Sequence, residues 1–402
     1  MANLESKTTF RQPYVSKAVT VDSNLNSLQG IKINDLTAGN PVSTYLLTGT
    51  TGNAFAAPGY GALYSGAIDG ASTSTGSGSG TWYNFSVPST WSPQETSVYG
   101  PDILTSGSGP NGIGDVALAG TWLNSQGKTI GWYYQGSISA LSNDTTGAVS
   151  NGFKSFQATV SGTSNPANYT YLHSVDGGYV VGNYTTSDGV IALTLNTAPG
   201  SGSFIYNPRS QTQTNISYSD GAKYHTTFGI WANDNSTYTI SGGASFNDRK
   251  LFSKKAISQI KTVLPDATLG KGMLADVDPI TGTATNIHHY NYDNSRSRNI
   301  LTHFQGIYYA GDNIYQAPYV ATTATGKLYT GNAFIKRFDN GQFSKNAVWQ
   351  KFEATSAGSA LITTSAASDG NTGVFNSGAN PPPPFASTSD IQPYLLAAQT
   401  LV

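Results

Sequence analysis

Short apolar segments that begin at a glycine recur along this chain at nearly constant spacing. They are GALYSG at Gly61, GWYYQG at Gly131, GSFIYN at Gly202, GMLADV at Gly272 and GNAFIK at Gly331. Successive glycines are separated by 70, 71, 70 and 59 residues. Self-similarity at a fixed period is the sequence signature of a repeat architecture, so the pattern predicts five related units.

A second apolar segment, which contains a glycine beside polar or aromatic residues, precedes each of the first. These segments are TYLLTG (44–49), VALAGTW (116–122), GYVVGNY (178–184), TYTISGG (237–243) and IYYAGDN (307–313). Each pair predicts two β-strands, and about 70 residues suffice for a four-stranded antiparallel sheet with its loops. The sequence therefore predicts an all-β fold, a five-bladed β-propeller with four-stranded antiparallel blades. A β-solenoid is the alternative, but its repeats are usually much shorter.

Strand-like segments also remain at both ends of the chain. They are GIKINDL (30–36), SALITTS (359–365) and TGVFNSG (372–378), which predict that strands from both termini close one blade. We expect an N-terminal arm at 1–29, one propeller domain at 30–378, and a Pro-rich linker and C-terminal tail at 379–402. The tail could dock as a strand or helix, or contact a partner.

One segment interrupts the strand pattern. Residues 248–265, DRKLFSKKAISQIKTVLP, have apolar residues at helical spacing and contain five basic residues. This predicts one short helical insertion that packs over a blade edge with its basic face in solvent. An anionic partner or a membrane surface is the alternative for that face.

Composition narrows the classes of function. The chain has 402 residues with 21 Lys+Arg, 22 Asp+Glu and no Cys, and its formal net charge is -1. A neutral chain lacks the basic excess that nucleic-acid binding needs, and the absence of cysteine excludes disulfides and thiol chemistry. No apolar run approaches the roughly 18 residues of a membrane helix, so no integral membrane segment is expected. Polarity from hydroxyl and amide groups is typical of secreted or surface β-proteins, which predicts an extracellular location, although no signal peptide is visible.

The repeat resembles a known family of proteins. The strand GYVVGNY followed by GSFIYN is similar to the bacterial extracellular HAF-type repeats, in which a Gln-Ile-Val-Gly-Tyr strand leads to a Gly-Phe-Leu-Tyr strand. The resemblance covers most of 30–378 and implies a propeller-like, often exported protein without implying catalytic residues. Several units depart from it, notably GMLADV, and the loops here are longer.

Titratable side chains are densest at 286–303, NIHHYNYDNSRSRNILTH. A His base, a Tyr proton donor and an Arg that offsets anionic charge would suit elimination or acyl chemistry. Adjacent strand residues point to opposite faces, so not all of them can line one pocket, and a structural or rim cluster is the alternative. The catalytic candidates are His288, His289, Tyr290, Arg296, Arg298 and His303.

Aromatic side chains suit sugar stacking, and Asn and Arg side chains supply hydrogen bonds beside them. The candidates for ligand binding are Tyr292, Trp122, Tyr134, Tyr184, Trp231 and Tyr309. Carboxylates are scarce, with Glu only at positions 5, 95 and 353. Asp115, Asp176 and Asp312 recur near the glycine of the second segment, so three blades could point one carboxylate each toward a shared rim. We prefer a turn role for them, because most Asp residues here stand in turn contexts.

The sequence predicts no cofactor and contains no recognisable metal motif. Asp276 and Asp278 in DVDPITG could help hold calcium, but no full calcium-loop spacing follows. Three functions stay open: a propeller that binds a small polar ligand or glycan, a lyase or hydrolase acting near 286–303, and a structural or adhesion protein. The sequence does not specify an oligomeric state.

Overall fold

The regular structure of this chain is almost entirely β-strand. The computed structural model describes residues 15–18, 25–34, 44–53, 56–67, 80–105, 112–141, 152–186, 200–233, 236–246, 269–295, 299–323, 328–351, 361–369, 372–378 and 391–397. The helical turns described there in full are α1 (Ile138–Leu141), η1 (Ser89–Trp91) and η4 (Tyr292–Asn294), and no helix in these ranges is long and apolar enough to cross a membrane. The all-β prediction is confirmed. The predicted helical insertion at 248–265 lies outside the described residues.

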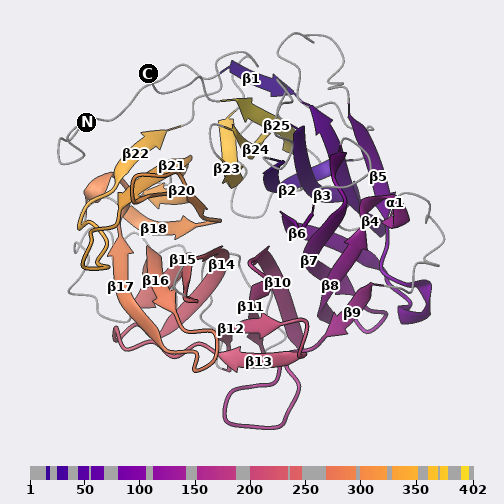
Figure 1. Ribbon diagram of the computed structural model, residues 1–402, viewed down its shortest axis with the longest axis horizontal. Coiled ribbons are helices and arrows are strands. Elements are labelled where there is room, and N and C mark those ends of the chain that lie inside the picture. The colour runs from indigo at the N-terminus through magenta and orange to yellow at the C-terminus, as the bar shows by residue number, and fades with distance from the viewer. Residues whose placement is uncertain are drawn as a thin grey trace.

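The described strands form four sheets around a central axis (Figure 1). Two of these sheets divide where a single residue pair, Gly59 with Glu95 or Gly270 with Leu301, joins neighbouring strands in parallel, which leaves six antiparallel groups. The first three groups are β2 (Leu25–Asn34), β3 (Thr44–Asn53), β4 (Ala56–Ala67) and β5 (Thr81–Phe85); β6 (Glu95–Ile103), β7 (Asp115–Leu123), β8 (Thr129–Ser137) and β9 (Phe153–Phe156); and β10 (Tyr169–Asp176), β11 (Tyr179–Thr185), β12 (Gly202–Asn207) and β13 (Thr212–Asn215). The fourth is β14 (Tyr224–Ala232), β15 (Tyr238–Phe246), β16 (Leu269–Val277) and β17 (Ala284–Tyr290).

The fifth group is β18 (Asn299–Phe304), β20 (Ile314–Thr323), β21 (Leu328–Lys336) and β22 (Val348–Lys351), with the short β19 (Tyr308–Tyr309) beside β20. The sixth is β23 (Leu361–Asp369), β24 (Thr372–Gly378), β25 (Ile391–Ala397) and β1 (Val15–Ala18). In Figure 1, β2, β6, β10, β14, β18 and β23 lie innermost. Radially packed four-stranded sheets are the arrangement of a β-propeller. The expected count of five blades is not confirmed, because the described strands fall into six groups.

Strands from both chain ends meet in the sixth group. β1 pairs antiparallel with β25, and β23 of the same sheet contacts both β20 and β2. Strands from both chain ends thus share one sheet. The N-terminal strand of that sheet is β1, however, and the expected segment 30–36 begins within β2 of the first group.

The repeated pairs correspond to the second and third strands of the first four groups. VALAGTW in β7, for example, pairs with GWYYQG in β8. Val116 through Trp122 of β7 are all buried, because a strand inside the ring has a neighbouring sheet against each face. The fifth pair is displaced: GNAFIK in β21 pairs with β20, and not with the segment 307–313.

Close packing between groups explains the repeated glycines Gly61 and Gly131. A Cβ atom on Gly61 would lie 2.6 Å from Cγ2 of Val98, and one on Gly131 would lie 2.8 Å from Cγ of Leu172. Both distances are too short for real contacts between carbon atoms. In each case the apolar side chain belongs to the innermost strand of the next group, so glycine lets the two sheets approach.

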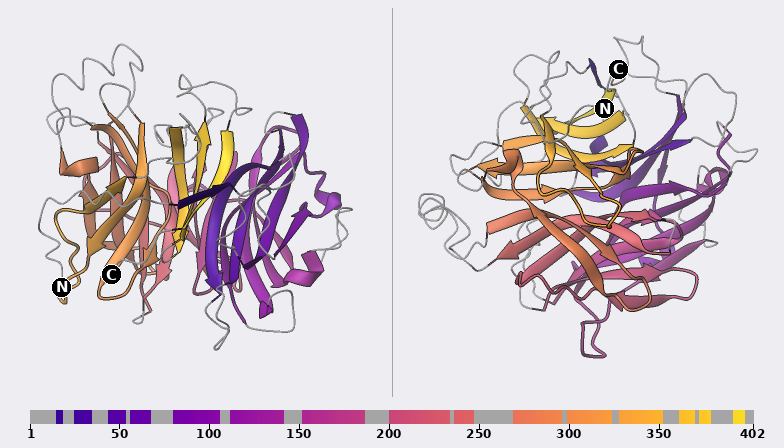
Figure 2. Two further views of the ribbon diagram at one scale, coloured as in Figure 1. Left: turned by 90° about the horizontal axis from the view of Figure 1, so that it is seen from above. Right: turned by 60° about the vertical axis from the view of Figure 1, so that its left-hand side comes forward.

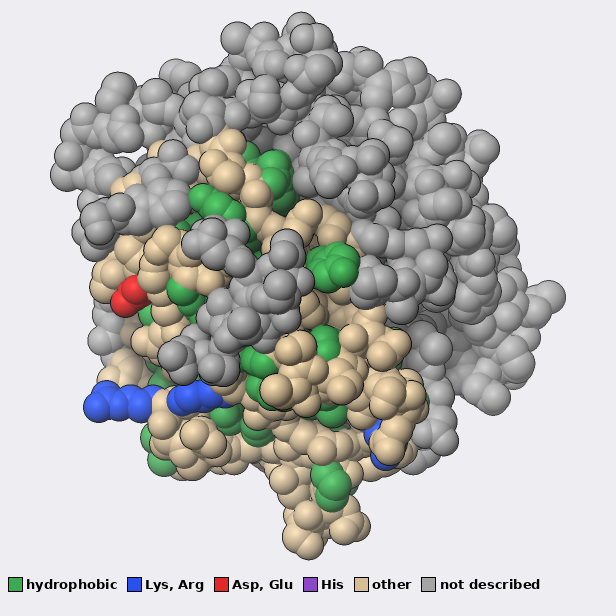
Figure 3. All heavy atoms as spheres, turned by 90° about the vertical axis from the view of Figure 1, so that its right-hand side faces the viewer, with side chains coloured by type: hydrophobic (Ala, Val, Ile, Leu, Met, Phe, Trp, Pro, Cys, Tyr) green, Lys and Arg blue, Asp and Glu red, His purple; other side chains and the backbone are tan. Residues whose placement is uncertain are grey.

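Aromatic pairs fill the interfaces between neighbouring groups, whose strands stand side by side around the axis in Figure 2. Phe85 meets Trp132 edge to face with ring centroids 5.9 Å apart, and the centroids of Phe156 and Tyr206 are 4.0 Å apart. These contacts belong to an apolar core that lies between the successive sheets of the first five groups. On the face drawn in Figure 3, only a few of the coloured side chains are charged.

Candidate functional site

A hollow lies where the innermost strands reach their C-terminal ends. It has a volume of about 60 Å³, and its lining includes Lys32 of β2, Asp176 of β10, Trp231 of β14, Gln305 and Tyr308 of β19. Four different groups contribute these residues, because the innermost strands of these groups all end on this side of the ring. The volume suits several water molecules or one projecting chemical group. We call this hollow the axial cavity.

Lys32 is the centre of the charged groups at the axial cavity. Its Nζ atom lies 3.1 Å from Oδ1 of Asp102 and 3.0 Å from Oδ1 of Asp176. The same atom lies 5.4 Å from the centroid of the Trp231 ring, within the range of a cation–π contact. The three charged side chains are 23%, 10% and 13% exposed. One ammonium thus bridges two carboxylates beside an indole face.

The two carboxylates have different surroundings. Burial raises the pKa of the Asp102 carboxyl above its ordinary value, although the Lys32 ammonium works against that rise. Asp176 instead accepts a hydrogen bond of 2.6 Å at Oδ2 from the backbone N–H of Ala232. Because Ala232 ends β14, Asp176 also ties the third group to the fourth.

The axial cavity combines groups that recognise polar ligands. Carboxylates accept hydrogen bonds from hydroxyl or ammonium groups, the Gln305 amide can donate or accept, and the rings of Trp231 and Tyr308 give apolar faces. The two rings meet edge to face with centroids 5.5 Å apart. A ligand group that enters would therefore meet charge, hydrogen-bonding groups and aromatic surface together.

Four successive innermost strands also carry a row of packed rings. The centroids of Tyr99 and His173 are 5.1 Å apart, those of His173 and Phe228 3.9 Å, and those of Phe228 and His303 4.6 Å. Burial, with a smaller contribution from His303, lowers the pKa of His173 to about 3, and burial alone lowers the pKa of His303 to about 3. Both imidazoles are therefore neutral at physiological pH.

His303, one of the catalytic candidates, is held inside this row. The Gln305 amide donates to Nδ1 over 2.9 Å, so Nε2 carries the hydrogen and donates to Oγ1 of Thr226 over 2.7 Å. A hollow of about 10 Å³ touches His303, which is room for about one water molecule. The geometry provides a fixed hydrogen-bonding group rather than an open base.

The other histidine candidates and Tyr290 lie on β17, the outermost strand of the fourth group. The His288 Nε2 atom lies 3.2 Å from the carbonyl oxygen of Lys345, and the Tyr290 hydroxyl donates to the carbonyl oxygen of Ser344 over 2.9 Å. Tyr290 is buried, which raises its pKa. His288 and Tyr290 thus contact a turn of the fifth group. Arg296 and Arg298 lie outside the described residues.

His289 takes part in a separate cluster around Asp220. Its Nε2 atom lies 2.7 Å from Oδ2 of Asp220, and Nε2 of His225 lies 2.9 Å from the same oxygen. Burial alone would raise the pKa of Asp220, but the hydrogen bonds from both imidazoles outweigh it and hold the pKa well below its ordinary value. Within the described ranges, no three His, Asp or Glu side chains are placed to hold a metal ion.

Of the six aromatic candidates, Trp231 lines the axial cavity, and the Tyr309 ring lies near it with its centroid 6.2 Å from that of Trp231. The others pack elsewhere. Trp122, Tyr134 and Tyr184 are buried in the core, and Tyr292 stacks on Tyr329 with centroids 4.9 Å apart.

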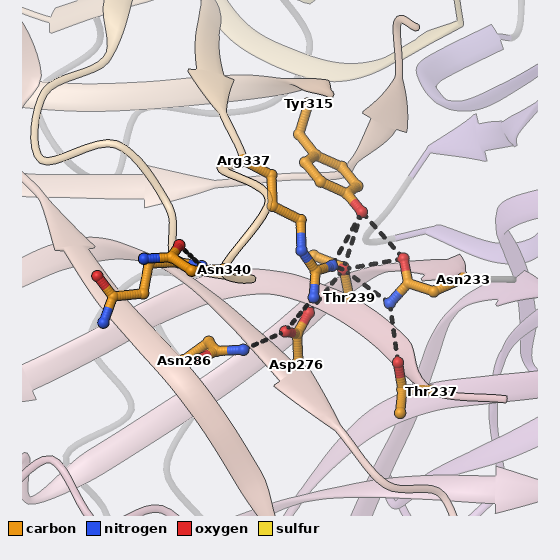
Figure 4. A network of polar contacts seen from close by, with 9 residues as sticks. Asn233, Thr237, Thr239, Asp276, Asn286, Tyr315, Arg337 and Asn340 are labelled. Carbon is orange, nitrogen blue, oxygen red and sulfur yellow. Dashed lines mark hydrogen bonds and ion pairs between the residues drawn. The ribbon is translucent and has the colours of Figure 1, made fainter. Parts of the chain in front are cut away.

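The two calcium candidates have different partners. Asp276 is buried and pairs with Arg337, whose Nη2 atom lies 2.6 Å from Oδ2 (Figure 4). Thr239 and Asn286 donate further hydrogen bonds to the same carboxylate. Asp278 accepts hydrogen bonds from two backbone N–H groups of its own turn, which lower its pKa. The guanidinium of Arg337 thus neutralises Asp276, one of the two predicted calcium ligands.

Sequence reasoning did not find Lys32 or Asp102, and it placed Asp176 in a turn. Only one feature of the sequence could have indicated these residues. Each is a single charged residue near the C-terminal end of the first strand of a group, in a chain where only 11% of residues are charged. Asp176 does precede a tight turn, formed by Gly177 and Gly178, but its carboxylate also reaches Lys32.

No family model and no curated protein sequence matches this chain. Several solved structures are similar at low identity. A GH43_1 enzyme from Xanthomonas citri complexed with xylotriose has 10% identity and a TM-score of 0.39, and the match covers 84% of this chain and 94% of that one. An alpha-L-arabinanase from Penicillium chrysogenum complexed with arabinobiose has 10% identity and a TM-score of 0.42, with 96% and 98% covered.

A Trypanosoma rangeli sialidase in complex with sialic acid is similar at 8% identity and a TM-score of 0.46, with 93% of this chain and 54% of that chain covered. Likenesses this weak transfer neither a site nor a reaction. The resemblance to HAF-type repeats stays a prediction, and function has to be argued from the axial cavity itself.

Proposed function

We propose that this chain is a propeller scaffold that binds a carbohydrate at the axial cavity. The observation that carries the proposal is the indole of Trp231 beside the bridge formed by Lys32, Asp102 and Asp176. Sugars present apolar C–H faces and rings of hydroxyl groups, so aromatic surface next to charged hydrogen-bonding groups matches both features.

The size of the axial cavity defines how such a ligand would sit. At about 60 Å³ the hollow holds a substituent such as a hydroxymethyl group, while the rest of the sugar stays at the rim near Tyr308 and Tyr309. The ion pair between Lys32 and Asp176 already fixes these side chains before a ligand binds. Binding therefore costs less conformational entropy than it would if they had to be ordered by the ligand.

Isothermal titration calorimetry with a panel of oligosaccharides tests the proposal. Trp231→Ala should weaken binding at least about tenfold, as expected when an aromatic anchor of about 1.4 kcal/mol or more is lost. Trp91→Ala is the matched control, because Trp91 is also partly exposed but packs against Trp122 in the second group. Equal affinities of the Trp231 variant and the wild type would refute this location.

A second function, glycoside hydrolysis, is favoured by the two carboxylates that share Lys32. Glycosidases generally use one carboxyl group that stays protonated as the acid and one ionised partner. Asp102, whose pKa burial raises, and Asp176 are the two carboxylates available for these roles. An assay for new reducing ends tests this function. Activity should be lost in both Asp102→Asn and Asp176→Asn and kept in the control Asp115→Asn, which changes an exposed residue. Binding without product would exclude it for the sugars tried.

A further inference from the structure

The cluster of charges at the axial cavity contains one more carboxylate than ammonium groups. Lys32 and Asp176 line the cavity, and Asp102, which is not part of the lining, pairs with the same Lys32 ammonium, so these described residues carry one positive and two acidic groups. The guanidinium of Arg337 does not line the cavity and is paired elsewhere, with its Nη2 atom 2.6 Å from the Asp276 carboxylate. All three groups of the cavity are largely shielded from water, so their charges act on a bound ligand with little screening.

The structure also shows how an ammonium group is accommodated here. The Lys32 ammonium lies between two carboxylate oxygens and over the Trp231 ring, the combination of carboxylate and aromatic face that stabilises organic cations. Acceptor capacity remains beyond Lys32, because a carboxylate offers about four lone-pair sites. Asp176 uses Oδ1 for Lys32 and Oδ2 for the N–H of Ala232.

We propose that the axial cavity selects its sugar by charge, preferring a glycan with a free amino group and rejecting one with a carboxylate or sulfate. This inference rests on the proposed function. A substituent small enough for the cavity is the part of the ligand that meets Asp176, the carboxylate in the cavity lining. An amino group there gains charge-assisted hydrogen bonds, whereas an added anion would be repelled by the unpaired negative charge.

Three probes of equal length and linkage test the selection: a glucosamine oligomer, a glucose oligomer and a glucuronic acid oligomer. Calorimetry should give the tightest binding for the first and the weakest for the last, with at least about tenfold between these two. Raising the salt concentration should weaken the glucosamine oligomer most, because screening acts on the charged pair.

The outcomes separate the two proposals. Equal binding of the three probes, or preference for the uronic acid, overturns charge selection and keeps sugar binding at the site. If Trp231→Ala leaves the affinity for a bound probe unchanged, the proposed function fails as well. If none of the three binds, both proposals fail for this class of sugar.

Two substitutions act in opposite directions on the selectivity. Asp176→Asn keeps an acceptor for the Ala232 N–H and removes one negative charge, so the affinity ratio of glucosamine to glucose oligomer should fall severalfold. Lys32→Met removes the positive charge and should raise the same ratio. The exposed Asp115→Asn should leave it unchanged. A fall in both variants, or no change in either, would contradict charge selection, and thermal unfolding curves show which variants are folded.

Discussion

Replacing Arg337 by methionine should be among the most damaging single changes outside the core, because it leaves a buried carboxylate without its cation. The Asp276 side chain is only 5% exposed, and the Arg337 side chain is 18% exposed. The guanidinium joins the fourth and fifth groups, since its Nη1 atom donates to the hydroxyl groups of Thr239 and Tyr315 (Figure 4).

The size of the effect can be worked out from the contacts that remain. Breaking a buried ion pair by removing one partner generally costs about 3–5 kcal/mol. Asp276 would keep hydrogen bonds of 2.9 Å from Thr239 and 2.8 Å from Asn286, so we expect the lower end, about 3 kcal/mol. Asp276→Asn should cost less, about 1 kcal/mol, because Arg337 is more exposed and can turn toward water.

Urea unfolding of the wild type, the two single variants and the double variant measures these values and their coupling. The double variant should be more stable than the sum of the single effects predicts, by about 2 kcal/mol, because the uncompensated carboxylate is gone. A loss below about 1 kcal/mol for Arg337→Met, or additive effects within about 0.5 kcal/mol, would refute the assignment of this pair as a buried clamp.

Three further predictions concern stability. His173 and His303 are neutral in the folded protein, and each binds a proton when the protein unfolds at a pH below the ordinary histidine pKa. The free energy of unfolding should therefore be independent of these two groups above about pH 6.5 and should fall by about 2 kcal/mol for each of them by pH 5. Urea unfolding at a series of pH values measures this fall, and a flat profile contradicts it. Gly131→Ala should lower stability by about 1–3 kcal/mol because of its contact with Leu172, and an unchanged melting temperature would contradict the packing argument. Calcium should not raise the melting temperature, because a guanidinium already neutralises Asp276; a rise with added calcium would contradict this.

The repeat arrangement could be predicted because burial on both faces leaves a strong local signal. The sequences of β7 and β8 are apolar runs that contain glycines where neighbouring atoms come close to the backbone. The second and third strands of the first, third and fourth groups have the same pattern. The sixth group escaped the count because its strands are weakly apolar and because β24 and β25 are not consecutive in sequence. The group is placed in the ring by the contacts of β23 with β20 and β2, and its fourth strand, β1, comes from the other end of the chain.

The axial cavity was harder to predict because its residues are isolated in the sequence. Lys32, Asp102, Asp176 and Trp231 stand on four innermost strands and meet only when the ring closes. Trp231 could be proposed from residue type alone, whereas a single Lys or Asp in a strand looks like an ordinary surface position. The segment 286–303 was predicted as one site because its titratable residues are close together in the sequence. In the structure, neighbours along the strand point to different faces and contact different partners.

The central claim, that sugars bind at the axial cavity, is tested most directly by fluorine NMR of protein labelled with 5-fluorotryptophan. The chain has six tryptophans, and comparison with Trp231→Phe identifies the signal of Trp231. Titration with an oligosaccharide that binds should shift this signal with saturation at the calorimetric affinity, while the signal of Trp91 stays in place. A shift confined to other tryptophans, or saturable binding with no change at Trp231, would contradict the account.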